Sequence, residues 1–240
     1  MTDHSLAQGA QAAAAPASRA PRGHALPWLA AMCLVLTVAG PWIFDTYLLN
    51  VLIKALFFAM AAVTVDVLWG YTGHLTFGQS AFFGVGAYAA GLAFTHYGFS
   101  PATAALAALV AVGAVALLAL VTGWLSFYRG ASPFFATVIS LVLPIVLMQL
   151  VLAGGTYTGS SSGLTGYETF DLSLEAWYVI AAGTLSVVAL LAWVVMRSDG
   201  GRILVALRDN ESRCSYLGLN TAHWRIVLLV VCGAVASLAG

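Results

Sequence analysis

Charged residues are scarce in this sequence: Asp, Glu, Lys and Arg make up 8% of its 240 residues, whereas hydrophobic residues make up 61%. An average soluble domain contains about 25% charged and about 45–50% apolar residues. This scarcity excludes a soluble enzyme, and a mean hydropathy of +0.94 indicates a protein surrounded by lipid. The nine Lys and Arg are balanced by nine Asp and Glu. No basic surface is therefore available to neutralise phosphates, and nucleic acid is not expected as a partner.

Several chemical motifs are absent as well. Lys54 is the only lysine and lies in no GxxxxGK[ST] pattern, so the chain has no P-loop of its own for ATP. The three cysteines form no CxxC pair and the five histidines are too scattered for an HExxH motif. We therefore expect no metal site, no cofactor and no catalytic residue. An intramembrane serine hydrolase would need Ser80 with His96 or His223 as its base, and no residue in the sequence orients either histidine.

Long uncharged stretches fill the space between the charged residues. Each can hold a span of about 20 apolar residues, and together they predict helices at residues 25–44, 47–69, 80–97, 101–127, 133–153, 176–196 and 226–240. The expected fold class is all-α: a polytopic transmembrane helical bundle of about seven spans. The last span is expected to be incomplete, because the stretch from Ile226 to Gly240 reaches only about 22 Å of a hydrocarbon core about 30 Å thick.

The basic residues indicate the orientation, because Lys and Arg stay in cytoplasmic loops. With the N-terminus inside, every arginine falls on the cytoplasmic side. The opposite side receives the acidic residues Asp45, Glu168, Asp171 and Glu175. Residues 1–24 are rich in alanine and lack apolar periodicity, which predicts a disordered cytoplasmic tail before a transmembrane domain at 25–240. A cleaved signal peptide is the alternative, but Pro41 directly follows the small residues that could form its cleavage site.

Two stretches carry candidate residues for a pathway through the bundle. Residues 70–80 form an uncharged, glycine-broken segment, and non-helical backbone at membrane depth persists only where protein buries it or where it lines a water-filled cavity. A short cytoplasmic turn is the alternative. In the helix at 133–153, Pro144 removes a backbone hydrogen bond and leaves the carbonyl of Ser140 free, although hydroxyls in membrane helices often bond only their own backbone. The candidate pathway residues are Thr72, Gly73, Thr76, Gln79, Ser140 and Pro144.

The outer loop at residues 156–175 is rich in Gly, Ser and Thr and also carries acidic residues. This composition is compatible with a mobile solvated loop or with a contact surface for an external partner.

The cytoplasmic segment at 197–225 has the period of a surface helix. Ile203, Leu207, Cys214 and Leu217 fall within one arc at 100° per residue, which predicts a helix from Arg202 to Leu217. Within it Asp209 and Arg213 form an i, i+4 pair, Gly218 is placed as a stop, and Asn220 or Thr221 can cap the next helix. A helix lying on lipid is the alternative. The mixed charge favours docking to a soluble partner instead.

The residues of these stretches resemble a known family. The resemblance covers residues 47–240 and is carried by GYTG-x-LTFG-x-x-AFFG-x-GAY at 70–88, SGLTG at 162–166, GR at 201–202, A-x-RDNE at 206–211 and LG at 217–218. In this pattern and order the chain looks like the permease subunits of ABC importers for branched-chain amino acids and related small polar solutes.

The resemblance implies a subunit of the bacterial inner membrane that pairs with a second homologous permease, two cytoplasmic ATPase subunits and a periplasmic substrate-binding protein. ATP hydrolysis would be the work of the partner subunits. In such importers a short helix of the cytoplasmic loop docks into the ATPase, a role that falls here on the loop at 197–225. The coupling residues that the resemblance implies are Arg202, Arg208, Asp209, Glu211 and Gly218.

The chain departs from the family pattern at Asp66, where Asn is more usual, at Gln79, where His is more usual, and at Arg213 and Cys214, where small residues follow Glu211. Family members also continue through further spans beyond the position of Gly240, which leaves two alternatives: a truncated form of a longer permease, or a last helix that is completed by packing. The substrate stays open among branched-chain amino acids, urea and short amides. A self-sufficient secondary transporter or channel is the main alternative, but apart from Asp66 the chain offers no ionisable coupling residue near mid-membrane.

Overall fold

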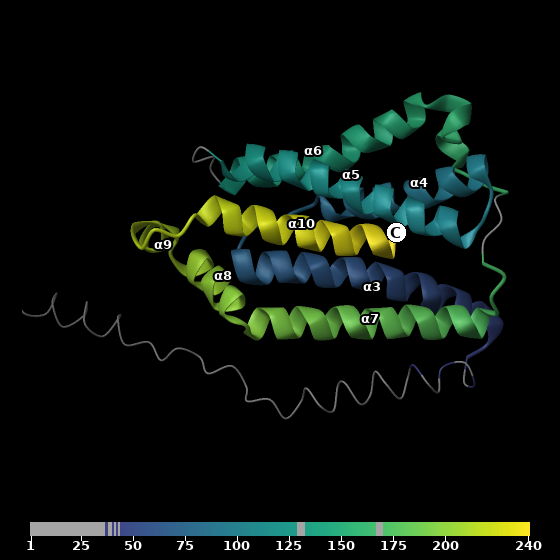
Figure 1. Ribbon diagram of the computed structural model, residues 1–240, viewed down its shortest axis with the longest axis horizontal. Coiled ribbons are helices and arrows are strands. Elements are labelled where there is room, and N and C mark those ends of the chain that lie inside the picture. The colour runs from purple at the N-terminus through teal and green to yellow at the C-terminus, as the bar shows by residue number, and fades with distance from the viewer. Residues whose placement is uncertain (1–36, 38–39, 41, 43, 129–132, 167–169) are drawn as a thin grey trace, which may run out of the picture.

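The computed structural model describes residues 44–128, 133–166 and 170–240 together with Thr37, Gly40 and Trp42. The predicted tail at 1–24 and most of the predicted first helix at 25–44 lie outside the described residues. Helices are named as in Figure 1, so the numbering begins at α3.

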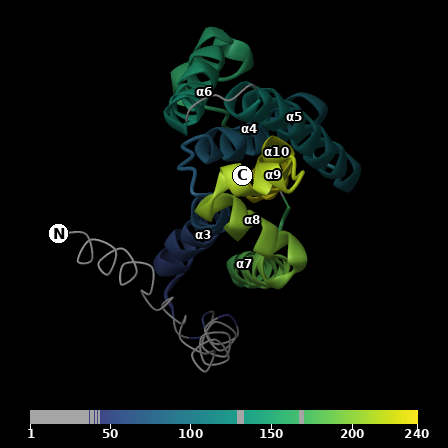
Figure 2. The same ribbon diagram turned by 90° about the vertical axis from the view of Figure 1, so that its left-hand side faces the viewer.

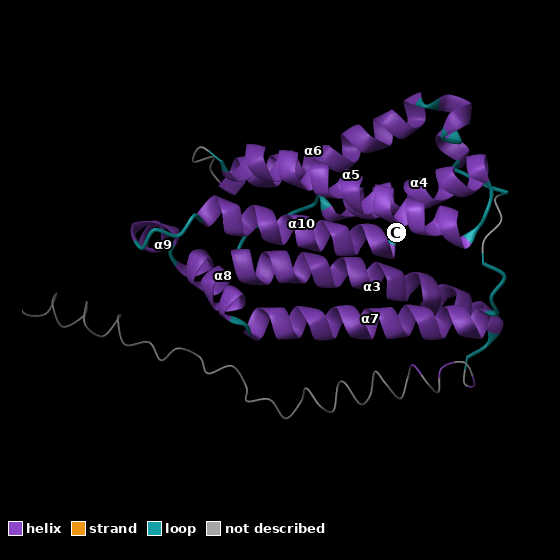
Figure 3. Ribbon diagram, viewed as in Figure 1, coloured by secondary structure: helices purple, strands orange, loops and turns teal. Residues whose placement is uncertain are grey.

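Eight α-helices follow one another along the described part of the chain, and no strand occurs there (Figure 3). The long helices are α3 (Thr46–Thr72), α4 (Gln79–Tyr97), α5 (Pro101–Phe127), α6 (Pro133–Ala153), α7 (Leu174–Arg197) and α10 (Thr221–Ala239). Two short helices, α8 (Asp199–Asp209) and α9 (Glu211–Tyr216), separate α7 from α10, and two 3₁₀ turns, Gly155–Tyr157 and Ser160–Ser162, follow α6. The predicted all-α helical bundle is confirmed.

Five described helices are long and apolar enough to cross a membrane: α3, α5, α6, α7 and α10. The predicted bounds of α5 and α6 agree with the structure. The predicted span at 80–97 is a helix, α4, but it is not among the five, since glycines and polar residues dilute its apolar character.

The last helix begins before the predicted apolar span at 226–240, and its cap is Asn220, one of the two caps that the sequence predicts. It starts at Thr221 rather than at Ile226, because the Asn220 side chain caps it by accepting a 3.1 Å hydrogen bond from the His223 backbone N–H. The polar first turn therefore belongs to the helix. Its 19 residues extend over about 28 Å.

Helix α10 occupies the middle of the bundle. Seen from the end that bears α8 and α9, it is surrounded by α3, α4 and α5, while α6 and α7 lie on opposite sides (Figure 2). Small residues permit this close packing: a Cβ on Gly86 of α4 would collide with the carbonyl oxygen of Ser237 in α10. Phe82, Val115 and Ala236 are completely or almost completely buried where α4, α5 and α10 meet.

The described charged residues lie at the two ends of the bundle, apart from Lys54 and Asp66, which lie within α3. The arginines of α8, α9 and the adjoining ends of α7 and α10 gather at the left-hand end in Figure 1. Asp45, before α3, and Asp171 and Glu175, at the start of α7, belong to the opposite end. Of the described residues, the arginines are thus confined to one end, as the sequence predicts. Acidic residues occur at both ends, because Asp199, Asp209 and Glu211 share the arginine-rich end.

Candidate functional site

The irregular part of the predicted 70–80 segment is shorter than the sequence indicates. Helix α3 continues through Gly70 and ends at Thr72, and α4 begins at Gln79, so only Gly73–Gly78 is non-helical; we call it the α3–α4 connection. Gly73 adopts a left-handed conformation with φ of 71°, and its N–H donates to the Trp69 carbonyl. This C-cap turns the chain out of the helix at a position that suits glycine.

Helix α6 holds the α3–α4 connection through two hydroxyl groups. The Phe77 backbone N–H donates to Ser140 Oγ at 3.1 Å, and Thr137 Oγ1 donates to the Leu75 carbonyl at 3.3 Å. Ser140 Oγ itself donates to the Thr137 carbonyl at 2.7 Å. Two backbone groups of the connection thus find hydroxyl partners on α6, although Leu75 and Phe77 themselves are exposed.

Pro144 contributes indirectly. Because proline has no N–H, the Ser140 carbonyl loses its intrahelical donor. That carbonyl oxygen lies 3.6 Å from the position that a Cβ on Gly78 would occupy, at the start of α4. The predicted pair of Ser140 and Pro144 is thus placed against the end of the connection.

The connection and the start of α4 bring together buried polar groups, two of whose atoms have no partner among the described residues. Thr76 is 9% exposed and Gln79 only 2% exposed. Gln79 Oε1 accepts a 3.2 Å hydrogen bond from Thr64 Oγ1 of α3, but Gln79 Nε2 and Thr76 Oγ1 have no partner among the described residues. Thr72, in contrast, has partners on both sides: its hydroxyl donates to the Leu68 carbonyl at 2.6 Å and accepts from the His74 backbone N–H at 3.4 Å.

A small cavity of about 20 Å³ lies beside the connection, with room for a single water molecule. Its lining comes from the connection and from α4, α5, α6 and α10, and includes His74, Thr76, Ser126, Ser140 and Leu229. The structure thus brings Thr76 and Ser140, predicted from separate stretches, to one place.

His74 is a residue of this site that the sequence did not single out. It is 8% exposed, its Nδ1 lies 3.1 Å from the Thr72 carbonyl, and its ring meets the Phe127 ring edge-on at 5.2 Å. Burial lowers the pKa of the His74 imidazole below its ordinary 6.5; the Thr72 carbonyl opposes the shift, the Arg225 charge adds to it and the Glu211 charge opposes it. The net shift favours the neutral imidazole of His74.

The predicted single helix from Arg202 to Leu217 is wrong. The structure breaks it at Asn210, whose backbone is extended (φ −158°, ψ 93°) and whose Oδ1 accepts a 3.0 Å hydrogen bond from the Arg213 N–H. Asn210 therefore ends α8 and caps α9. The predicted buried face is right for Leu207 and Cys214, which are buried.

Beyond α9 the expected turn is present, but Leu217 is not on the buried face. Leu217 is 81% exposed, beside Tyr216 at 90%. Gly218 has the left-handed φ, 83°, that its predicted role as a helix stop requires. We call α8, α9 and Leu217–Gly218 together the coupling segment.

Arg208 bonds to α3. Its Nη1 donates to the Gly70 carbonyl at 2.6 Å, while Nε and Nη2 each donate to Asp209 Oδ1 at 3.2 Å. Asp209 therefore pairs with its neighbour Arg208, and the structure shows no ion pair between Asp209 and Arg213 among the described residues. Arg202 forms an exposed ion pair with Asp199 at 3.1 Å.

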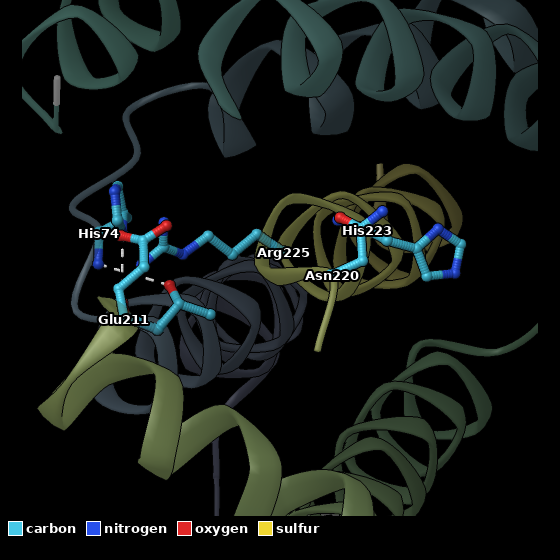
Figure 4. Close-up of polar contacts among 6 residues, drawn as sticks. His74, Glu211, Asn220, His223 and Arg225 are labelled. Atoms are coloured by element: carbon cyan, nitrogen blue, oxygen red, sulfur yellow. Dashed lines mark hydrogen bonds and ion pairs between the residues drawn. The ribbon is translucent and has the colours of Figure 1, made fainter. Parts of the chain in front are cut away.

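Glu211 bonds to α10. Its Oε1 accepts a 2.8 Å hydrogen bond from Nη1 of Arg225, which extends from the first turns of α10 toward Glu211 and lies beside His74 (Figure 4). The Arg225 side chain is 8% exposed, whereas Glu211 is half-exposed. The Arg225 guanidinium also lies 5.8 Å from the Phe127 ring centre. The sequence treated Arg225 only as a topology marker, since its partner is 14 positions earlier and on another helix.

Comparison with known proteins gives the chain a family. The model of the family described as "Branched-chain amino acid transport system / permease component" matches residues 47–240, the range over which the sequence resembles such permeases. No solved structure matches the chain.

Individual relatives are also permeases. The chain is 31% identical over 150 residues to the ribose import permease protein RbsC of Escherichia coli K12. The matched region covers 58% of this chain and 43% of RbsC. It is also 24% identical over 237 residues to the high-affinity branched-chain amino acid transport system permease protein LivM of Salmonella typhimurium and of Escherichia coli K12. The matched region covers 86% of this chain and 54% of LivM. The chain thus spans about half the length of these relatives. With the family model matching most of its length, this multi-pass helical chain belongs to the branched-chain amino acid permease family of ABC transporters.

Proposed function

We propose that this chain is the transmembrane permease subunit of an ATP-binding-cassette importer and forms part of the pathway for branched-chain amino acids or related small polar solutes across the bacterial inner membrane. Family membership and the likeness to LivM support this proposal. The chain has no P-loop, so partner ATPase subunits would supply the energy.

The observation that carries the proposal is the α3–α4 connection. It is irregular backbone held by α6. Together with the first residue of α4, it presents two buried polar atoms, Thr76 Oγ1 and Gln79 Nε2, that have no partner in the described part of the chain. Such atoms can hydrogen-bond a polar solute that passes. We assign the contacts with solute to these two residues, and a supporting role to Thr72, Gly73, Ser140 and Pro144, which shape the connection.

The ends of the bundle carry the proposed partner contacts. The arginine-rich end faces the cytoplasm in this proposal, with the N-terminus on the same side, and the exposed Tyr216 and Leu217 of the coupling segment meet an ATPase subunit. The acidic end, with the 3₁₀ turns that follow α6, meets a periplasmic substrate-binding protein. Apolar side chains exposed on the spanning helices face lipid and a second, homologous permease.

Ribose import is a second candidate, favoured by the 31% identity to a ribose import permease. A monosaccharide and an amino acid both offer hydroxyl or amino groups that neutral Thr and Gln side chains can bind. The substrate therefore needs a direct measurement.

Uptake by cells tests the proposal. A strain in which the gene is deleted should lose energy-dependent uptake of one radiolabelled solute among leucine, urea, acetamide and ribose, and a plasmid copy should restore it. Gly73→Leu should abolish the restored uptake while the protein still inserts into the membrane, because position 73 has a positive φ and lies against Arg208.

The matched control is Gly113→Leu in α5, where an added Cβ would meet no atom of a neighbouring part of the chain within 4 Å. It should leave uptake near the level of the unchanged chain. If Gly73→Leu transports normally, the α3–α4 connection is an ordinary turn. If deletion changes the uptake of none of the four solutes, the proposed function is wrong for this substrate class.

A further inference from the structure

Two arginine contacts attach the coupling segment to the bundle on either side of the break at Asn210. Before the break, Arg208 of α8 bonds to the Gly70 carbonyl at the end of α3. After it, Glu211 of α9 bonds to Arg225 at the start of α10. Both contacts end beside the α3–α4 connection, the element to which the proposed function assigns solute contact.

The Arg208 contact is specific in its chemistry. Helix α3 ends at Thr72, so the Gly70 carbonyl is one of the last four of that helix and has no intrahelical donor. A guanidinium is a favourable partner there, since the carbonyl end of a helix carries partial negative charge. Arg208 is therefore a C-terminal partner of α3 that is supplied by another helix, 138 positions later in the chain.

Gly73 is shaped to fit this contact. The Arg208 stem crosses directly over it, so that a Cβ at position 73 would lie 2.9 Å from Arg208 Cγ. The left-handed turn that opens the connection is thus in van der Waals contact with the same side chain that bonds to Gly70. Movement of α8 relative to α3 would act on this turn first.

The Arg225 contact reaches the other side of the connection. Arg225 is buried, and Glu211 is its ion-pair partner. Its guanidinium lies over Phe127, and Phe127 meets His74 of the connection edge-on. Removing Glu211 would leave the buried Arg225 cation beside His74 without its counter-charge. An unpaired buried charge strongly destabilises a folded protein.

We infer that Arg208 and the Glu211–Arg225 pair are positioning contacts that hold the α3–α4 connection to the coupling segment, so that displacement of α9 reaches Thr76 and Gln79 through them. This inference rests on the proposed transport function. It separates these residues from the exposed Tyr216 and Leu217. Arg208 and Glu211 are partly exposed but bond to α3 and α10, whereas a residue that only docks an ATPase would have no such bond to the permease.

The test uses complexes purified through an affinity tag on the full chain and reconstituted in liposomes. Arg208→Ala should retain ATPase subunits within twofold of the unchanged complex and still hydrolyse ATP, but should lose at least tenfold of the ATP-driven uptake of the solute that the cell assay identifies. Arg208→Lys, which keeps a cationic donor for the Gly70 carbonyl, should recover part of the uptake. The control is Arg197→Ala at the end of α7, whose guanidinium lies over Trp193 of its own helix.

A second measurement does not depend on transport. In a chain with its own cysteines replaced, Thr76→Cys should react slowly with a thiol reagent because position 76 is buried. Adding Arg208→Ala or Glu211→Gln should raise the labelling rate several-fold, and adding Arg197→Ala should not.

The outcomes separate the two claims. If the unchanged complex shows no ATP-driven uptake, the proposed function fails, and the labelling rates still decide the inference. If uptake and ATPase retention fall together in Arg208→Ala, Arg208 is a docking residue and the inference is wrong. Unchanged labelling of Thr76→Cys in both variants would also overturn it.

Discussion

Arg208 Nη1 lies 2.6 Å from the carbonyl oxygen of Gly70, so that a side chain from the coupling segment completes the end of α3. The same side chain lies over Gly73, which opens the α3–α4 connection. The segment proposed to dock an ATPase and the segment proposed to contact solute therefore share one residue contact.

Gly73→Ala tests that contact energetically. We expect it to destabilise the protein by roughly 1–2 kcal/mol, from the positive φ and from the close approach to Arg208 Cγ. In an Arg208→Ala background the close approach is gone and only the cost of φ remains, so the same substitution should cost at least about 0.5 kcal/mol less. Thermal unfolding of the four proteins in detergent measures this, and equal costs in both backgrounds would show that the two residues do not interact.

Glu211→Leu should destabilise the protein by about 2 kcal/mol, because it leaves the buried Arg225 without its ion partner. The loss stays below the about 3–5 kcal/mol typical of fully buried pairs, since Glu211 is half-exposed. Adding Arg225→Met should recover most of the loss, because an apolar side chain of similar length has no charge to desolvate. A double variant no more stable than Glu211→Leu would contradict this account of the pair.

His74 predicts a dependence of stability on pH. Because burial lowers the pKa of His74 in the folded protein below 6.5, the unfolded chain binds more protons there, and stability rises with pH. The contribution is complete above pH 6.5 and is lost as the pH falls below that value toward the folded pKa. We expect the midpoint temperature of unfolding to decrease as the pH is lowered from 7.5 to 5.5. His74→Gln should reduce the dependence of the unfolding free energy on pH by up to about 1.4 kcal/mol per pH unit. An identical slope in both proteins would exclude His74 as its source.

Much of the fold could be predicted from the sequence because the physical signal was local. The uncharged stretches gave the bounds of α5 and α6, where apolar residues end at the turns. The errors have local causes too. Gly70 looked like a helix breaker, but α3 continues to Thr72 and ends at the left-handed Gly73. Asn210 lies on a helical period, yet its side chain caps α9 instead.

The candidate site was only partly predictable. Thr76 and Ser140 were named from composition and from Pro144, and they line one cavity. The partners of Arg208 and Arg225 could not be read from periodicity, because each bond joins different helices. His74 was overlooked for the same reason: its environment is made by α5 and by the turn before it, which one sequence does not reveal.

Thiol labelling tests the proposed orientation. In a chain without its own cysteines, Ser161→Cys should react with an impermeant thiol reagent added to intact cells, whereas Ser198→Cys should react only after the membrane is opened. Both positions are exposed and lie at opposite ends of the bundle, so accessibility within the protein does not differ between them. Labelling of Ser198→Cys alone in intact cells would reverse the topology.

The central claim is that this chain is a transport subunit driven by a partner ATPase. The most direct measurement is solute uptake by liposomes that contain the complex purified through a tag on this chain, a substrate-binding protein outside and ATP inside. We predict uptake of one small polar solute that requires enclosed ATP and stops when a non-hydrolysable analogue replaces it. Uptake that proceeds equally without ATP, driven by an ion gradient, would contradict the account and identify a secondary transporter.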